Sequence, residues 1–374
     1  MKTIRIVAAD DSTVMRSLLT HMFATQHTGA QVRLELCAAV PDGASCLHAA
    51  RTLHPDVVLL DMHMPGLGGL ETIVRLRHEW PRLPIIMCSS ATEDGAAVTL
   101  EALSRGASDY VTKPARQVDA EAAVACLWAQ LVPKIIALAL SEADIAGSLC
   151  NLPNTVISRP HVEVVGVGVS TGGPAALGQL LPFLPEDFPV PVLVVQHMPK
   201  LFTSALTARL DRCCALRVEQ ATAGISLRPG TIWIAPGDSH MEVKMGSQGM
   251  AHLILHKGEQ LHHCRPSVDV LFRSLAQSFG AGAMGLVLTG MGADGLEGSR
   301  AIVKAGGIVL AQDEASSAVW GMPGRVVAAA LARAVLPLEK LGEEVVSLTY
   351  PSASRSSAAT RSEGTEQGVR HGFY

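Results

Sequence analysis

Short runs of β-branched residues alternate with helix-forming segments along most of this chain, and the alternation comes in two series. The first series covers residues 1–120, and the second begins near Val162. Strands separated by helical segments are typical of doubly wound α/β folds with a mostly parallel sheet, because parallel strands need long crossover connections. The sequence therefore predicts two α/β units, which agrees with a length of 374 residues, more than one core usually organises.

The segments between and after the two series differ in composition. A helix is expected over 118–140, and residues 141–160 then lose periodicity and gather Gly, Pro, Asn and Ser, as linkers do. Residues 351–374 are small, polar and aperiodic, which predicts disorder. We expect a first domain at 1–120, a helix and interdomain linker at 121–160, a second domain at 161–350 and a disordered tail at 351–374.

Charge and hydropathy exclude several classes of protein. A formal net charge of −4 with 17% charged residues gives no basic footprint for nucleic acid. The longest apolar stretch, 122–140, is interrupted by Gln130, Pro133 and Lys134, which are costly in a bilayer. The first residues resemble no secretion signal, and the eight cysteines form no C-x-x-C pair. We expect a cytoplasmic protein that neither binds nucleic acid nor inserts into a membrane.

Acidic residues follow two strands of the first series. Asp10 and Asp11 come after the first run and Asp61 after the third. In an open parallel sheet the carboxyl ends of the strands form the ligand crevice, so these acids should meet there. Like charges at close range need a cation, and oxygen ligands of this kind suit Mg²⁺. A helix cap is the alternative interpretation for Asp11, which precedes Ser12 at a helix start.

Two further polar residues follow strands at the same edge. Ser89 ends the fourth run and Lys113 follows the fifth. A carboxylate beside Mg²⁺ and a lysine is well placed to accept a phosphoryl group, since both cations spread the charge on its oxygens. The order of these elements, acid pair, acid, hydroxyl and lysine, favours this interpretation over isolated helix caps.

Four blocks in residues 1–120 carry a resemblance to a known family: "ADDSTVMR", "LLDMHMPGLGGLE", "MCSSA" and "DYVTKP". The sequence resembles the receiver domain of bacterial response regulators, which implies a doubly wound, flavodoxin-like α/β fold. The resemblance also implies roles for individual residues: Asp61 as phospho-acceptor, Asp10 and Asp11 with Asp61 as Mg²⁺ ligands, Ser89 as switch hydroxyl, Tyr110 as switch aromatic and Lys113 as phosphate partner.

A glycine-rich turn around Ser170 opens the second series. Residues 168–172 read G-x-S-x-G, a pattern that exposes a serine on a tight turn between a strand and a helix. A dinucleotide-binding loop is the alternative, but G-x-G-x-x-G would need glycine at 171, where Thr171 stands. The glycines therefore favour a serine nucleophile.

Two more residues complete a hydrolytic set. His197 ends the strand expected beside that of Ser170, and Asp294 lies in a glycine-rich turn after a later strand. A nucleophilic serine needs a nearby base, and a carboxylate that orients the base and stabilises its charged form. Glu297 is a weaker candidate for the carboxylate, because it falls in the next helix.

Six blocks of the second series, in order, carry a second resemblance: "GVSTGGPAAL", "VQHMP", "WIAPGDSHM", "RPSVDVLF", "LTGMGADG" and "LAQDEASSAVWGMP". They resemble the catalytic domain of CheB-type protein-glutamate methylesterases over residues 160–348. The resemblance implies Ser170 as nucleophile, His197 as base and Asp294 as its orienter, with Thr171 and Met291 as oxyanion donors and Arg265 facing the substrate. One departure stands out: the family commonly reads "HRPSVD", and Cys264 replaces that histidine.

The two resemblances together imply a function. A histidine kinase would phosphorylate the receiver with Mg²⁺, and the receiver would stop blocking the catalytic crevice. The α/β hydrolytic domain, without a cofactor of its own, would then remove methyl esters from glutamates of methyl-accepting chemoreceptors and deamidate specific glutamines. Two alternatives remain open: the same enzyme serving a non-flagellar chemosensory array, and a catalytically silent, phosphorylation-controlled interaction module.

Overall fold

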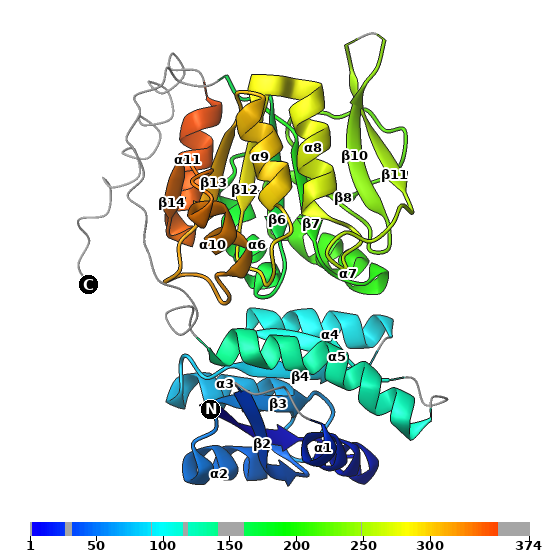
Figure 1. The fold of residues 1–374 in the computed structure, drawn as a ribbon, viewed down its shortest axis with the longest axis vertical. Helices are drawn as coiled ribbons and strands as arrows, with labels where there is room; N and C mark the ends of the chain where they lie inside the picture. The colour runs from blue at the N-terminus through cyan, green and yellow to red at the C-terminus, as the bar shows by residue number, and fades with distance from the viewer. Residues whose placement is uncertain are drawn as a thin grey trace, which may run out of the picture.

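Two parallel sheets, each flanked by helices, lie one beyond the other along the long axis of the molecule (Figure 1). The structure, a computed structural model, describes residues 2–26, 32–90, 92–114, 119–140, 161–247 and 249–350. The predicted linker at 141–160 and the predicted disordered tail at 351–374 lie outside the described residues. The expected α/β fold class is confirmed for both domains.

The first domain is a five-stranded parallel sheet in the order β2-β1-β3-β4-β5. Its central strand β3 is buried along its whole length, as expected of an apolar run between two helical layers. The elements are β1 (Lys2–Ala9), α1 (Thr13–Thr25), β2 (Val32–Val40), α2 (Gly43–Leu53), β3 (Val57–Asp61), α3 (Gly69–Glu79), β4 (Ile85–Ser89), α4 (Glu93–Ser104), β5 (Asp109–Thr112) and α5 (Ala120–Ala139).

The second domain has a seven-stranded parallel sheet in the order β14-β13-β12-β6-β7-β9-β8, and a separate antiparallel hairpin of β10 and β11. Its elements are β6 (Val164–Val169), α6 (Gly173–Leu180), β7 (Val192–Gln196), α7 (Lys200–Asp211), β8 (Arg217–Gln220), β9 (Thr231–Ile234), β10 (His240–Met245), β11 (Ala251–His256), α8 (Val268–Phe279), β12 (Ala283–Val287), α9 (Leu296–Lys304), β13 (Ile308–Gln312), α10 (Gly321–Ala328), β14 (Ala334–Leu336) and α11 (Leu338–Thr349).

Strand β6 lies at the centre of this sheet and its glycines let a helix approach closely. A Cβ atom at Gly168 would lie 2.3 Å from Cγ1 of Val268, at the start of α8. No real Cβ tolerates that distance, so α8 packs directly on the β6 backbone. The loop before α8 and the turn after β6 are thereby held close together.

Several sequence expectations about element boundaries were incomplete. The sequence predicts that the fourth helix of the first domain starts at Gly95, but α4 begins at Glu93, because Thr92 caps it. The sequence predicts a strand over 252–257, and the structure has it as β11, Ala251–His256, in an antiparallel hairpin with β10. The sequence did not predict β10, since "HMEVKM" mixes polar and apolar residues without a strong strand signal. Strands β8 and β14 and helix α11 were also missed, and both of these strands are short.

The two domains pack together through α4 and the start of β5. Helix α4 lies against α6 and α7 of the second domain (Figure 1). The ring of Tyr110 stacks on that of Phe202, with centroids 4.5 Å apart and planes 19° apart. Buried apolar side chains form one continuous cluster from the first domain through these two rings into the second. This part of the interface is therefore apolar.

Helix α5 is long and apolar enough, by length and composition, to cross a membrane. In the structure it packs on the first sheet instead, with Leu127, Leu131 and Ile135 fully buried. Gln130 and Lys134, the polar residues that interrupt its apolar run, bond to β5. The absence of membrane insertion and the cytoplasmic location stay predictions.

Candidate active site and phosphorylation site

Three carboxylates and a lysine meet at the carboxyl edge of the first sheet. The ammonium of Lys113 lies 2.8 Å from Oδ2 of Asp10 and 2.9 Å from Oδ1 of Asp61. Carboxylate oxygens of Asp10, Asp11 and Asp61 lie within 4.8 Å of one another. Ser12, rather than Asp11, caps helix α1, so the alternative interpretation of Asp11 as a helix cap is wrong.

The charges at this edge are only partly balanced. Burial raises the pKa of Asp61, and although Lys113 opposes this, the net shift is upward. Burial alone would lower the pKa of Lys113, but its hydrogen bonds and ion pairs with Asp10 and Asp61 raise it. Three carboxylates against one ammonium leave excess negative charge on hard oxygen donors. This donor set fits a Mg²⁺ ion.

Ser89 and Tyr110 point to different neighbours. The hydroxyl of Ser89 is 2.6 Å from that of Thr99 and donates to the carbonyl of Gly95, so it is bonded to α4. Ser89 also lines the cavity that contains Asp61 and Lys113. Tyr110 is buried at the domain interface against Phe202. Ser89 therefore faces the acidic pocket, whereas Tyr110 lies at the surface that contacts the second domain.

The adjacent strands β6 and β7 bring Ser170 and His197 to one edge of the second sheet. Val169 pairs with Gln196 in parallel register, and the two functional residues follow directly. The amide of Gln196 donates to the carbonyl of Ser170, and Gly172, at φ +78°, makes the tight turn into α6. The strand neighbourhood predicted for the serine and the histidine is present.

Asp294 is buried and held by many donors. It follows β12, the neighbour of β6 on the other side, and its Oδ2 lies 2.8 Å from Nε2 of His197. It also accepts hydrogen bonds from the hydroxyl of Ser267 and the backbone N–H groups of Val268, Asp269 and Gly295. Burial alone would raise the pKa of Asp294, but these bonds and His197 lower it to about 2. The carboxylate therefore stays ionised beside the imidazole.

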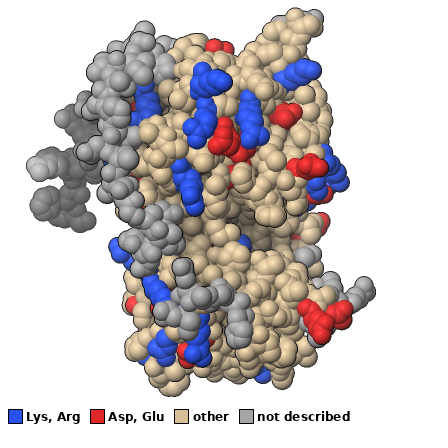
Figure 2. Space-filling model, in the orientation of Figure 1, with Lys and Arg blue, Asp and Glu red and all other residues tan. Residues whose placement is uncertain are grey.

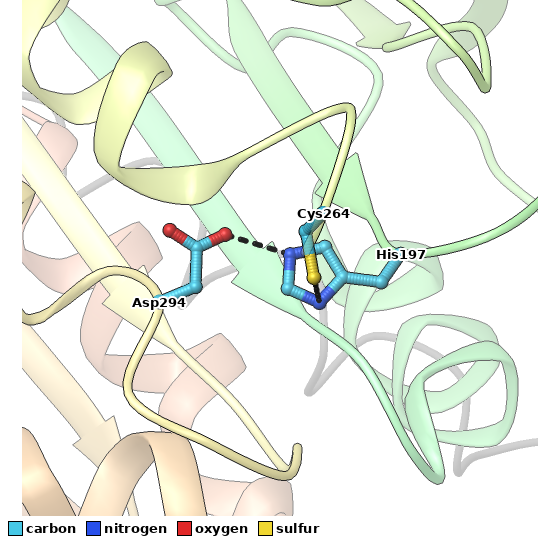
Figure 3. Close-up of side chains that lie close together, drawn as sticks. All are labelled: His197, Cys264 and Asp294. Atoms are coloured by element: carbon cyan, nitrogen blue, oxygen red, sulfur yellow. Dashed lines mark hydrogen bonds and ion pairs between the residues drawn. The ribbon is translucent and has the colours of Figure 1, made fainter. Parts of the chain in front are cut away.

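His197 lies between a carboxylate and a thiol. Figure 3 shows Asp294 and Cys264 at opposite nitrogens of the ring, with Sγ of Cys264 3.5 Å from Nδ1. Burial alone would lower the pKa of His197, but the bonds to Asp294 and Cys264 raise it to about 10. Within the described residues, the hydroxyl of Ser170 forms no hydrogen bond with the imidazole. The imidazole therefore faces Cys264, and its raised pKa favours the charged form.

The other residues expected at the site have distinct positions. Thr171 is buried and its hydroxyl donates to Oδ2 of Asp109, from the first domain, at 2.8 Å. Met291 is exposed and lines the same cavity as Ser170. Arg265 is not free for a substrate in this structure, because its guanidinium is paired with Asp238 and donates to the carbonyl of Gly258.

Sequence reasoning missed two residues of the first domain at the candidate active site. Asp109 and Lys134 form an ion pair at 2.8 Å, and Lys134 also donates to the carbonyl of Tyr110. With Tyr110 they line a cavity of about 230 Å³ that also contains Ser170 and His197. The one signal available was Lys134 itself, a charge placed within an apolar helix. Figure 2 shows the surface hollowed where the two domains meet.

The fold and these two sites define a class: a receiver-like domain with an acidic pocket, joined to an α/β domain that carries a serine, histidine and aspartate. Comparison with known proteins agrees. The response regulator receiver domain family matches residues 6–125, and the CheB methylesterase family matches residues 165–345.

Relatives match along nearly the whole chain. One from Trichodesmium erythraeum is 41% identical over 355 residues, covering 92% of this chain and 99% of the relative. Others from Nocardioides sp. and Thermotoga maritima are 42% and 33% identical, covering 92% and 93% of this chain and 95% and 99% of the relatives. All three are named protein-glutamate methylesterase/protein-glutamine glutaminase. This chain belongs to the CheB methylesterase family.

Proposed function

We propose that this protein hydrolyses methyl esters of glutamate side chains, and the amides of specific glutamine side chains, in methyl-accepting chemoreceptors. The observation that carries the proposal is the strand-end arrangement of Ser170, His197 and Asp294, with His197 and Asp294 2.8 Å apart. The names of the relatives supply the substrate class. The choice between flagellar and other chemosensory arrays has no structural determinant among the described residues.

The reaction is acyl transfer through a serine ester. The oxygen of Ser170 attacks the side-chain carbonyl of the substrate while His197 takes the serine proton. His197 then gives that proton to the leaving methanol, or to ammonia in the amide reaction. Water, deprotonated by His197, releases the carboxylate from the enzyme. Asp294 orients the ring and stabilises its charged form throughout.

Thr171 and Met291 are the proposed oxyanion donors. Both residues line the cavity beside Ser170, and Thr171 precedes the first turn of α6. The backbone N–H groups at a helix N-terminus favour developing negative charge, so this position suits the tetrahedral intermediate.

In the structure the first domain covers the proposed site. Asp109, Tyr110 and Lys134 close the 230 Å³ cavity, which is far smaller than a receptor helix requires. Asp109 bonds the hydroxyl of Thr171, and Tyr110 stacks on Phe202. We propose that this closed arrangement is the inactive form and that a protein substrate enters only when the domains separate.

Phosphorylation of Asp61 by a histidine kinase is the proposed trigger. Asp10, Asp11 and Asp61 would hold Mg²⁺, which would neutralise charge on the incoming phosphoryl group. Lys113, which now bridges Asp10 and Asp61, follows β5, the strand that carries Asp109 and Tyr110. A phosphoryl group adds negative charge beside Lys113, and the resulting shift at the end of β5 would displace the residues that hold the domains together.

The experiment measures methanol release from methylated receptor membranes, with Mg²⁺ and a small-molecule phosphodonor present or absent. Release that rises with phosphodonor and disappears in Ser170→Ala supports both the hydrolase and its regulation. No release from folded protein with more than one receptor preparation would contradict the enzyme and favour the silent interaction module.

A further inference from the structure

Cys264 occupies a position next to the proposed catalytic base. Its Sγ lies 3.5 Å from Nδ1 of His197 and 3.4 Å from the carbonyl oxygen of His262. The side chain is partly exposed. Asp294 bonds the other ring nitrogen, so the order across the site is thiol, imidazole, carboxylate (Figure 3).

We propose that Cys264 is an oxidation site through which a hydroperoxide reversibly inactivates the enzyme. The proposal deepens the function proposed above, since the modified sulfur would act on the base of that same site. The class of co-reactant is a small hydroperoxide, with hydrogen peroxide as the simplest member.

The surroundings of Cys264 place an ionisable ring beside its sulfur. A thiolate is the nucleophile, and a neighbouring imidazolium stabilises it. His197 is such a neighbour, because Asp294 holds a negative charge on the far side of its ring. The raised pKa of His197 agrees with a charged ring beside the sulfur.

The closed arrangement leaves a path to the sulfur. Cys264 and His197 line a second cleft of about 320 Å³ at the edge of the domain interface. A hydroperoxide is only slightly larger than water, whose share of liquid volume is about 30 Å³. The cleft admits such a molecule although the domains exclude a receptor helix. Oxidation therefore does not need prior phosphorylation.

The oxidation needs only the peroxide, the thiolate of Cys264 and a proton from His197. The thiolate of Cys264 attacks one peroxide oxygen, so an S–O bond forms and the O–O bond breaks. The leaving hydroxide takes the proton from His197 and becomes water. Sulfur loses two electrons, which reduce the peroxide. The resulting sulfenic acid places an oxygen against Nδ1, the nitrogen that faces the thiol now, and the base can no longer serve Ser170.

A thiol reductant reverses the modification. One thiol attacks the sulfenic sulfur and releases water, and a second thiol cleaves the mixed disulfide to restore Cys264. This reversibility separates the proposed event from methionine oxidation, which thiols do not reverse without an enzyme.

The other described cysteines supply controls in the same chain. Cys213 is exposed, and Cys46 is buried with a pKa raised to about 12 by burial. Cys213 thus controls for exposure, and modification of Cys46 would report unfolding.

The first experiment treats the full-length, unphosphorylated protein with hydrogen peroxide and traps sulfenic acid with dimedone, followed by peptide mass spectrometry. We expect Cys264 to be labelled at least about tenfold faster than Cys213, and this advantage to disappear in His197→Gln. If Cys264 of the unmodified sequence is labelled no faster than Cys213, the proposal is wrong. This outcome does not depend on whether His197→Gln folds.

The second experiment measures ester hydrolysis before and after peroxide, each protein relative to its own untreated sample. The ester hydrolysis rate of the unmodified sequence should fall by about tenfold or more and recover with dithiothreitol. The rate of Cys264→Ser should fall by less than about twofold. Equal losses in both proteins overturn the proposal. If untreated protein hydrolyses no ester, the proposed function fails, and the labelling experiment still decides the fate of Cys264.

Discussion

Replacement of Asp109 by alanine should raise the activity of the unphosphorylated protein. Oδ2 of Asp109 accepts the hydroxyl of Thr171 at 2.8 Å, in a buried bond that joins the two domains. Alanine removes that bond and leaves the stack of Tyr110 on Phe202 in place. The domains should still close, but less tightly.

The expected rise in basal activity follows from the strength of the lost hydrogen bond between Asp109 and Thr171. A hydrogen bond to a charged group contributes about 1.5–3 kcal/mol, which corresponds to roughly tenfold to 150-fold in an equilibrium. If the open form is rare, basal hydrolysis should rise by that factor until the open form dominates. Asp109→Asn keeps the shape without the charge, and a neutral bond contributes about 0.5–1.5 kcal/mol, so its effect should be smaller.

The assay compares basal and phosphodonor-activated methanol release in the unmodified sequence, Asp109→Ala, Asp109→Asn and Asp56→Ala. Asp56 is an exposed acid of the same domain whose carboxylate, among the described residues, accepts from the backbone N–H of Arg5 and touches no residue of the second domain, so it controls for lost charge. We expect the highest basal rate for Asp109→Ala and the next highest for Asp109→Asn. Asp56→Ala and the unmodified sequence should share the lowest basal rate. A folded Asp109→Ala protein with an unchanged basal rate would refute the interdomain role of this carboxylate.

Further outcomes concern the nucleophile, the base and the acidic pocket. Ser170→Ala should lower methanol release at least about a thousandfold while phosphorylation of Asp61, measured by mass spectrometry, continues. Because the pKa of His197 is raised above 6.5 and the base must be neutral, kcat/KM should rise with pH to a midpoint above that value. Cys264→Ser should lower the midpoint, and an unchanged profile would show that the thiol does not act on the ring. Asp61→Asn should keep its basal rate and lose all response to phosphodonor, whereas a fully activated variant would contradict the proposed trigger.

Strand-end residues within each domain were predictable from the sequence. Ser170 and His197 each follow a run of apolar β-branched residues, and Asp294 follows another, so a parallel sheet brings them to one edge. The same reasoning placed Asp10, Asp61 and Lys113 together. Such predictions succeed because strand order and side-chain position depend on local patterns and on general rules of α/β folds.

Contacts that depend on how separate surfaces meet were not predictable. The bond between Asp109 and Thr171 joins residues 62 positions apart in different domains, and no periodicity encodes it. The contact of Cys264 with His197 depends on a loop in which His262 and His263 have positive φ, a conformation that their residue type does not signal. Short strands such as β8 were missed because tertiary packing, more than their own propensity, makes them extended.

The bond from Thr171 to Asp109 has a consequence for how the activity of this enzyme can be changed by mutation. Hydrolysis of a glutamate ester leaves a side-chain carboxylate beside Ser170, and the closed protein already holds a carboxylate there, on the hydroxyl of Thr171. The first domain thus carries an internal analogue of the proposed reaction product. Loss of the Thr171 hydroxyl should therefore free the site from this carboxylate and weaken self-inhibition.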